Sequence, residues 1–188
     1  MKTCVFITGT NCTGKTAVAK ALIQMFGGIK EATKEHTFCN DTRVCFAGKY
    51  TADGRFGGVD GFNNTRTLAG VVERGLEICD VIVCEGMYLH SFGLNLTNAM
   101  FKADKHLVVF LYADGITIAK RIKERSGNNI GVAVLPKQRG ASSSAKKWQS
   151  IGVPVMAFDT TKHTIEEEAE QVYTKILQLW DGSRDMTT

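Results

Sequence analysis

The chain has 188 residues, of which 44% are hydrophobic and 22% charged, and its formal net charge is +4. This length suits one globular core, so we expect residues 1–188 to form a single domain. Every apolar stretch is shorter than the roughly 20 residues that cross a bilayer, and we expect no signal peptide at the N-terminus. The six cysteines form no C-x-x-C pair. This usage favours reduced thiols and a cytoplasmic location.

The first informative segment is residues 9–16, which read G-T-N-C-T-G-K-T and fit the phosphate-loop pattern G-x-x-x-x-G-K-[ST]. An apolar run at residues 4–8 predicts a buried strand before it, and residues 14–26 have helical spacing after it. In such a context the loop's N–H groups and the helix N-terminus form an anion site. The segment therefore predicts a nucleotide site made by Gly9, Thr10, Asn11, Cys12, Thr13, Gly14, Lys15 and Thr16.

Two side chains of this loop have expected roles in the chemistry. Lys15 should reach the β- and γ-phosphates, and the hydroxyl of Thr16 should hold Mg²⁺. We therefore expect ATP and Mg²⁺ as cofactors.

Apolar runs and helical periodicity alternate along the rest of the chain. Strands are predicted at residues 43–47, 81–85, 107–112 and 153–158, and helices at 64–79, 95–102, 116–125 and 165–180. Residues 48–62 and 127–144 are interpreted as long loops. The alternation predicts an α/β fold of three layers, α/β/α, around a central five-stranded parallel sheet, as in P-loop NTPases.

The strand predicted at residues 81–85 is apolar until it ends in a carboxylate, Glu85, followed by Gly86. In open α/β sheets, ligands bind beyond the carboxyl ends of the strands. We therefore expect Glu85 beside the phosphate loop, where it holds Mg²⁺ with its water shell or orients a substrate hydroxyl.

The loop at residues 48–62 combines the residue types that an acceptor site needs. Lys49 and Arg55 suit phosphates, and Tyr50 and Phe56 suit ring stacking, so these four are predicted to bind substrate. Transfer to a hydroxyl needs a carboxylate that accepts its proton. Asp60 is the first candidate for this base, and Asp53 and Glu85 remain open.

Arg121 and Arg125 are four residues apart in a predicted helix, so both can point to one side. Their guanidinium groups suit the charge on a transferring phosphoryl group. They belong to a basic segment, residues 115–150, that we expect to clamp phosphates.

Three classes of phosphate-loop protein compete for this pattern. A GTPase switch needs an Asn/Thr-Lys-x-Asp motif, which the sequence lacks. A motor or transport ATPase usually has a longer chain and a strand that ends in Asp. The chain resembles small P-loop kinases of the nucleotide-kinase type, over essentially its whole length, and this resemblance implies an ATP-dependent kinase.

A narrower resemblance concerns the acceptor. Gly48-Lys49-Tyr50, Gly57-Gly58-Val59-Asp60 and Val83-Cys84-Glu85-Gly86 are similar to segments of bacteriophage 5-hydroxymethyluracil DNA kinases. The resemblance implies that Asp60 activates the 5-hydroxymethyl group of a modified base in phage DNA, in the host cell cytoplasm, as a step of thymine hypermodification. The aromatic loop would hold a flipped base, and the basic segment would neutralise DNA phosphates.

Two alternatives stay open. A deoxynucleoside monophosphate kinase would use Lys49, Arg55 and Arg121 on the acceptor phosphate. A non-catalytic, nucleotide-dependent DNA-binding module would bind ATP without transferring phosphate.

Overall fold

The computed structural model describes residues 1–41, 43–51, 57–59, 61–62, 64–90, 93–126 and 134–181. Its strands are β1 (Thr3–Gly9), β2 (Ile29–Ala32), β3 (His36–Cys39), β4 (Val44–Ala47), β5 (Val81–Glu85), β6 (Lys105–Tyr112) and β7 (Val155–Asp159). Its helices are α1 (Lys15–Met25), α2 (Thr65–Ile78), η1 (Met87–His90, a 3₁₀ turn), α3 (Leu94–Met100), α4 (Gly115–Ser126), α5 (Val134–Ser150) and α6 (Ile165–Asp181).

One sheet of seven strands, in the order β2-β3-β4-β5-β1-β6-β7, forms the centre of the fold. The pairs β4·β5, β5·β1, β1·β6 and β6·β7 are parallel, which confirms the five predicted parallel strands. The prediction of a five-stranded sheet is wrong in its size, because β2 and β3 extend the β4 edge as an antiparallel hairpin.

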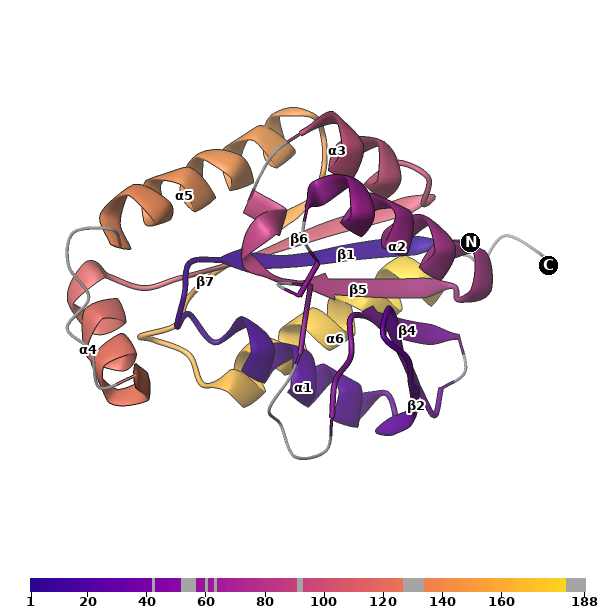
Figure 1. Ribbon diagram of the computed structural model, residues 1–188, viewed down its shortest axis with the longest axis horizontal. Helices are drawn as coiled ribbons and strands as arrows, with labels where there is room; N and C mark the ends of the chain where they lie inside the picture. Colours follow the sequence, from indigo (N-terminus) through magenta and orange to yellow (C-terminus); the bar gives the residue numbers. More distant parts are fainter. Residues whose placement is uncertain are drawn as a thin grey trace.

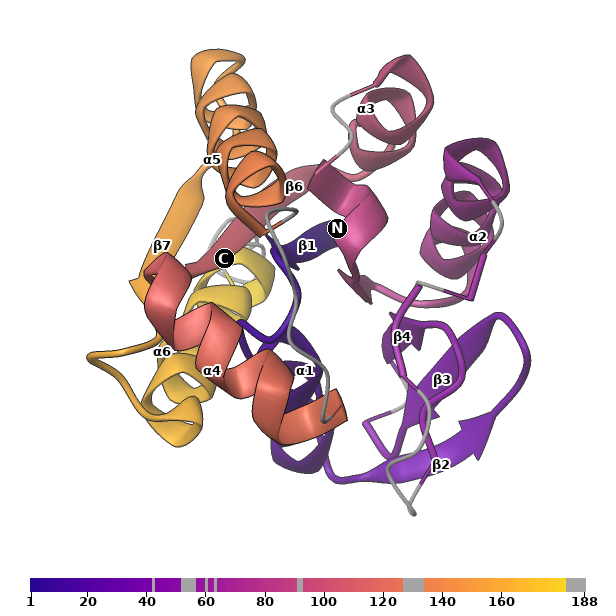
Figure 2. The same ribbon diagram turned by 60° about the vertical axis from the view of Figure 1, so that its left-hand side comes forward.

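Helices cover both faces of the sheet, so the predicted three-layer α/β fold is confirmed. Figure 1 shows α1 and α6 on one face and α2, α3 and α5 on the other. Each face has its own apolar core: one contains Leu22 and Ile176, the other Leu68 and Trp148. In Figure 2, α4 lies at the end of the sheet where α1 begins. The carboxyl ends of the parallel strands and the N-terminus of α1 therefore meet at one edge.

Local sequence explains where the elements begin. The side chain of Asn64 accepts a hydrogen bond from Thr67 N at 2.8 Å, which caps α2. Thr164 and Glu167 form a reciprocal capping box at the start of α6, with hydrogen bonds of 3.2 Å and 2.9 Å. Strand β7 begins one residue after Pro154, whose ring removes the N–H that a strand ladder needs.

The other correction is α5, which occupies part of the segment interpreted as a loop. Its buried residues are Ala141, Ser144, Ala145 and Trp148, spaced as one face of a helix. Among the described residues, no helix combines the length and the apolar character that crossing a membrane requires.

Candidate functional site

The phosphate loop joins β1 to α1, so the strand–loop–helix context that the motif requires is confirmed. Gly9 has a φ of +151°, and a Cβ there would collide with the main-chain oxygen of Leu111 on β6. Gly14 has a φ of +91° with open space around it, so glycine is favoured there by the backbone conformation and not by lack of room. The two glycines of the motif are therefore needed for different physical reasons.

Lys15, the first residue of α1, is buried within the loop. Its ammonium donates to Thr10 O at 2.7 Å, and the hydroxyl of Thr13 donates to the same oxygen at 2.9 Å. A cationic group is thus held inside the loop. This is the arrangement that phosphate binding requires.

Glu85, at the carboxyl end of β5, meets this loop as the sequence predicts. Its side chain is only 2% exposed. The hydroxyl of Thr16 donates to Glu85 Oε1 at 3.1 Å, and the hydroxyl of Tyr50 donates to Glu85 Oε2 at 3.3 Å. Strand β5 pairs directly with β1, so the sheet itself brings the carboxylate beside the phosphate loop.

Tyr50 is almost completely buried next to Glu85. Burial and, after it, the Glu85 charge raise the pKa of the Tyr50 phenol well above 10. The phenol therefore stays protonated and remains a hydrogen-bond donor. The main-chain N–H of Tyr50 donates to the hydroxyl of Thr37 at 2.8 Å, and that hydroxyl donates to Gly48 O at 2.9 Å.

The segment 57–59 packs directly on this pair of side chains. A Cβ at Gly57 would lie 2.8 Å from Tyr50 Cε1. Gly58 has a φ of +75°, and a Cβ there would collide with Glu85 Oε2 and Glu85 O. The N–H of Val59 donates to Glu85 O at 2.8 Å. Glycines at these positions let the segment 57–59 approach the carboxylate closely.

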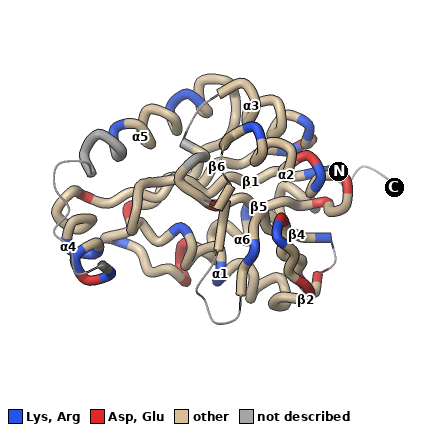
Figure 3. The backbone as a smooth tube through the Cα atoms, viewed as in Figure 1, with Lys and Arg blue, Asp and Glu red and all other residues tan. Residues whose placement is uncertain are grey.

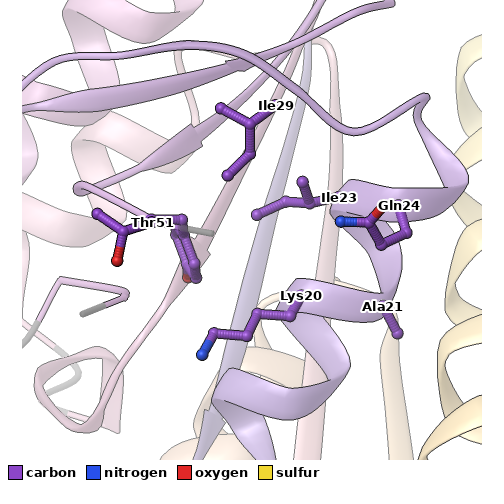
Figure 4. Close-up of a pocket in the computed structure, with 7 residues that line it drawn as sticks. Lys20, Ala21, Ile23, Gln24, Ile29 and Thr51 are labelled. Carbon is purple, nitrogen blue, oxygen red and sulfur yellow. The ribbon is translucent and has the colours of Figure 1, made fainter. Parts of the chain in front are cut away.

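A pocket of about 230 Å³ opens between α1 and the segment after β4. Figure 4 shows its lining, with Lys20 extending from α1 toward the side on which Thr51 lies. Tyr50 also lines it, so one side chain belongs both to this pocket and to the Glu85 contact. Lys20 was missed by the sequence reasoning, although it follows Thr16 by one helical turn.

A second pocket, of about 500 Å³, lies on the other side of the phosphate loop. Its walls are the loop at Cys12, Thr13 and Gly14, helix α4 at Arg121, and the segment from Thr160 into the start of α6. Arg121 donates to Thr160 Oγ1 at 2.7 Å, to Thr160 O at 2.8 Å and to Cys12 O at 3.4 Å. The guanidinium thus ties three segments of the chain around one cavity.

A buried carboxyl, Glu168 of α6, also lines the second pocket. It is 1% exposed, and its Oε1 has no hydrogen-bond partner. Burial raises the pKa of Glu168 from 4.5 to about 7, against the lowering effect of the Arg121 charge. Sequence reasoning missed Glu168, because its neighbours Glu166, Glu167 and Glu170 are all exposed and only packing separates it from them.

The structure places the other predicted site residues as follows. Lys49 precedes Tyr50 and is exposed, and Asn11, in the phosphate loop, is exposed as well. Arg125 is exposed one turn after the half-buried Arg121. Asp53, Arg55, Phe56 and Asp60 lie outside the described residues. The predicted residues with hydrogen bonds around the phosphate loop are Thr10, Cys12, Thr13, Lys15, Thr16, Tyr50, Glu85 and Arg121.

Comparison with known proteins adds the fold to this geometry. No protein-family model matches the chain, and a search of curated proteins found no match. The solved YorR protein of Bacillus subtilis, in complex with phosphorylated GDP, is 13% identical, with a TM-score of 0.58, and the match covers 93% of this chain and 96% of that one. A gluconokinase from Sinorhizobium meliloti 1021 is 13% identical, with a TM-score of 0.57, over 98% and 97% of the two chains.

A third solved structure is deoxyadenosine kinase from M. mycoides with bound dCTP. It is 12% identical, with a TM-score of 0.50, and the match covers 92% of this chain and 98% of that one. At these identities the likeness concerns the fold. The chain therefore has the three-layer α/β fold of these solved structures, across nearly its whole length.

Proposed function

We propose that this protein is an ATP-dependent kinase that transfers the γ-phosphate to a hydroxyl acceptor. The observation that carries the proposal is the hydrogen bond from Thr16 to Glu85 at 3.1 Å, beside the buried ammonium of Lys15. A cation for the phosphates, a hydroxyl and a carboxylate in one place are the parts that phosphoryl transfer uses.

The oxygens of Thr16 and Glu85 fit Mg²⁺, which prefers hard oxygen ligands and is often bound by one or two carboxylates together with substrate phosphates. These two residues would hold the ion, and Tyr50 would keep Glu85 in place through its 3.3 Å hydrogen bond. When bound, Mg²⁺ neutralises charge on the β- and γ-phosphate oxygens.

ATP would bind with its phosphates on residues 9–16 and its base in the pocket of about 500 Å³ beside the loop. Arg121 forms one wall of that pocket, and a planar guanidinium can stack on a base. Two solved structures of the same fold contain nucleotides, phosphorylated GDP in one and dCTP in the other, which supports a nucleotide at this edge. Arg125, exposed on the same helix, is proposed to add positive charge above the phosphates.

The acceptor that we propose is the 5-hydroxymethyl group of 5-hydroxymethyluracil in DNA. Its support is the sequence resemblance of the segments around Tyr50, Asp60 and Glu85, together with the pocket of about 230 Å³ beside Tyr50. Asp60 is proposed as the base that accepts the hydroxyl proton. Lys49, Arg55 and Phe56 are proposed to complete the acceptor site with Tyr50.

Exposed cations support a DNA acceptor. Figure 3 shows Lys and Arg along α4 and α5. Those that are exposed are Lys120, Lys123, Arg125, Arg139, Lys146 and Lys147. Their positive charges would attract DNA phosphates, whose neutralisation makes affinity depend on salt.

One observation favours a second candidate, a deoxynucleoside monophosphate kinase. The half-buried Lys20 lines the pocket of about 230 Å³, and an ammonium inside a pocket suits the phosphate of a small acceptor.

The test measures transfer of labelled γ-phosphate from ATP with Mg²⁺ to three acceptors: duplex DNA with 5-hydroxymethyluracil, the same duplex with thymine, and a panel of deoxynucleoside monophosphates. We expect label in the modified duplex alone, and a rate about 10²–10⁴-fold lower for Asp60→Asn. Asp53→Asn tests the alternative base: a loss below tenfold in Asp60→Asn together with a large loss in Asp53→Asn would move the role to Asp53. Label in a monophosphate would establish the second candidate, and ATP binding without transfer would indicate a non-catalytic module.

A further inference from the structure

The carboxyl of Glu168 has no assigned role in the fold or in the proposed phosphate chemistry. The start of α6 is already capped by Thr164 and Glu167, which bond to each other's main-chain N–H groups. The N–H of Glu168 donates to Thr164 O at 3.1 Å, as in any helix, so only its side chain is unexplained.

This side chain is an exception to a general rule of protein interiors. Buried polar atoms almost always have a hydrogen-bond partner, and leaving one without a partner is destabilising, above all for a charged group. Glu168 is 1% exposed, and its Oε1 has no partner. A carboxyl kept under these conditions is explained if its partner belongs to a ligand.

The position of Glu168 indicates which part of a ligand this is. It lines the pocket of about 500 Å³ together with Cys12, Thr13 and Gly14 of the phosphate loop. If the loop holds the triphosphate, as in the proposed function on which this step rests, the pocket beside it receives the base. The group that meets Glu168 is therefore a hydrogen-bond donor on the edge of the base.

We infer that Glu168 reads the base of the bound triphosphate by accepting a hydrogen bond from the exocyclic amino group of adenine. A carboxylate oxygen is an acceptor only, and the N6 amino group of adenine supplies a donor. Hypoxanthine and guanine have a carbonyl oxygen at the same ring position, which would face the carboxylate with lone pairs on both sides, and their N1–H donor lies at the neighbouring ring position. Glu168 thus selects ATP over ITP and GTP.

Before a ligand binds, burial and the Glu167 charge oppose ionisation of Glu168 and outweigh the Arg121 charge, so the pKa of this carboxyl is raised. A hydrogen-bond donor from the ligand adds to the effect of Arg121 and stabilises the ionised carboxylate, which can only accept hydrogen bonds.

The experiment measures the dissociation constants of Mg²⁺-ATP and Mg²⁺-ITP by calorimetry, which needs no knowledge of the acceptor. The variants are Glu168→Gln, Glu168→Met and Glu170→Gln. Glu170 is exposed on the same helix and serves as the control for loss of one negative charge. Thermal unfolding of each variant reports whether it is folded.

We expect wild-type protein and Glu170→Gln to bind ATP about 10- to 100-fold more tightly than ITP, the effect of one hydrogen bond to a charged group. In Glu168→Gln the amide can turn its N–H toward the carbonyl of ITP, so the ratio should fall to near one. In Glu168→Met the advantage of ATP should disappear with no gain for ITP.

A wild-type ratio near one, or an equal loss for both nucleotides in Glu168→Gln, overturns the assignment and leaves the kinase proposal standing. Failure of every triphosphate to bind overturns the kinase proposal itself, and the assignment with it.

Discussion

The hydroxyl of Thr16 lies 3.1 Å from Glu85 Oε1, although 69 positions separate the two residues along the chain. The parallel pairing of β1 with β5 creates this contact, because both strands end at the same edge of the sheet. The pairing of β1 with β5 therefore brings together the two proposed Mg²⁺ ligands, one after the phosphate loop and one at a strand end.

Lys15→Met should weaken ATP binding by roughly 10- to 100-fold, because the variant loses the charge-assisted contact to the phosphates. Isothermal titration with Mg²⁺-ATP measures this loss. Lys120→Met, which removes an exposed lysine of α4, is the matched control and should bind as wild type does. Equal effects of the two variants would contradict a specific role for Lys15.

Tyr50→Phe should raise the Mg²⁺ concentration needed for half-maximal transfer, because Glu85 Oε2 loses the donor that holds it at 3.3 Å. The ring that packs edge-on against Phe46 stays in place, so we expect a loss of unfolding free energy of only about 1–2 kcal/mol. Tyr173→Phe, on α6 against Phe26, is the control. An unchanged Mg²⁺ dependence in Tyr50→Phe would show that Glu85 is positioned without the phenol.

Gly58→Ala should destabilise the protein by more than about 2 kcal/mol, since a left-handed conformation disfavours Ala and its Cβ would meet the Glu85 carboxylate. Urea unfolding measures the loss. Gly140→Ala is the contrast: its Cβ would enter open space in α5, and helix propensity should give a gain of about 0.5–1 kcal/mol. A neutral Gly58→Ala would mean that Glu85 can move aside.

The raised pKa of Glu168 predicts how stability depends on pH. Between 4.5 and about 7 the folded state binds the Glu168 proton more strongly than the unfolded state does. The contribution of Glu168 to the free energy of unfolding is therefore largest below pH 4.5 and is lost as the pH rises through about 7.

Urea midpoints at about pH 5 and about pH 8 for wild type, Glu168→Gln and Glu170→Gln test this dependence. Glu168→Gln should gain stability relative to wild type at the higher pH, and Glu170→Gln should follow wild type. A constant difference between Glu168→Gln and wild type at both pH values would mean that the carboxyl titrates normally.

Much of the fold could be predicted because its central strands are continuous apolar runs. Residues 81–85 and 107–111 are buried, and such continuous apolar runs are recognised without knowledge of the tertiary structure. The β2–β3 hairpin escaped prediction because each strand has only four residues, and Lys30 and Glu31 are exposed on β2. Helix α5 escaped because Pro136, Gly140 and a run of serines have low helix propensity, which its packing through Trp148 overrides.

The candidate site also has one part that the sequence predicts and one part that it does not. The motif at residues 9–16 and the strand-end Glu85 could be predicted, since each depends on local sequence and on a general property of parallel sheets. Glu168 and Lys20 could not, because their importance depends on which side of a helix packs against a distant loop. A cluster of four glutamates in one helix gives no local signal for the one that is buried.

Two of the three hydrogen bonds from Arg121 end on main-chain oxygens, those of Cys12 and Thr160. The residue type at position 12 therefore has little effect on this contact, whereas its backbone conformation, with a φ of +58°, is one that most side chains adopt reluctantly. Among homologous sequences, we expect substitutions at position 12 to be mainly to Gly and Asn, and we expect Arg121 to be retained.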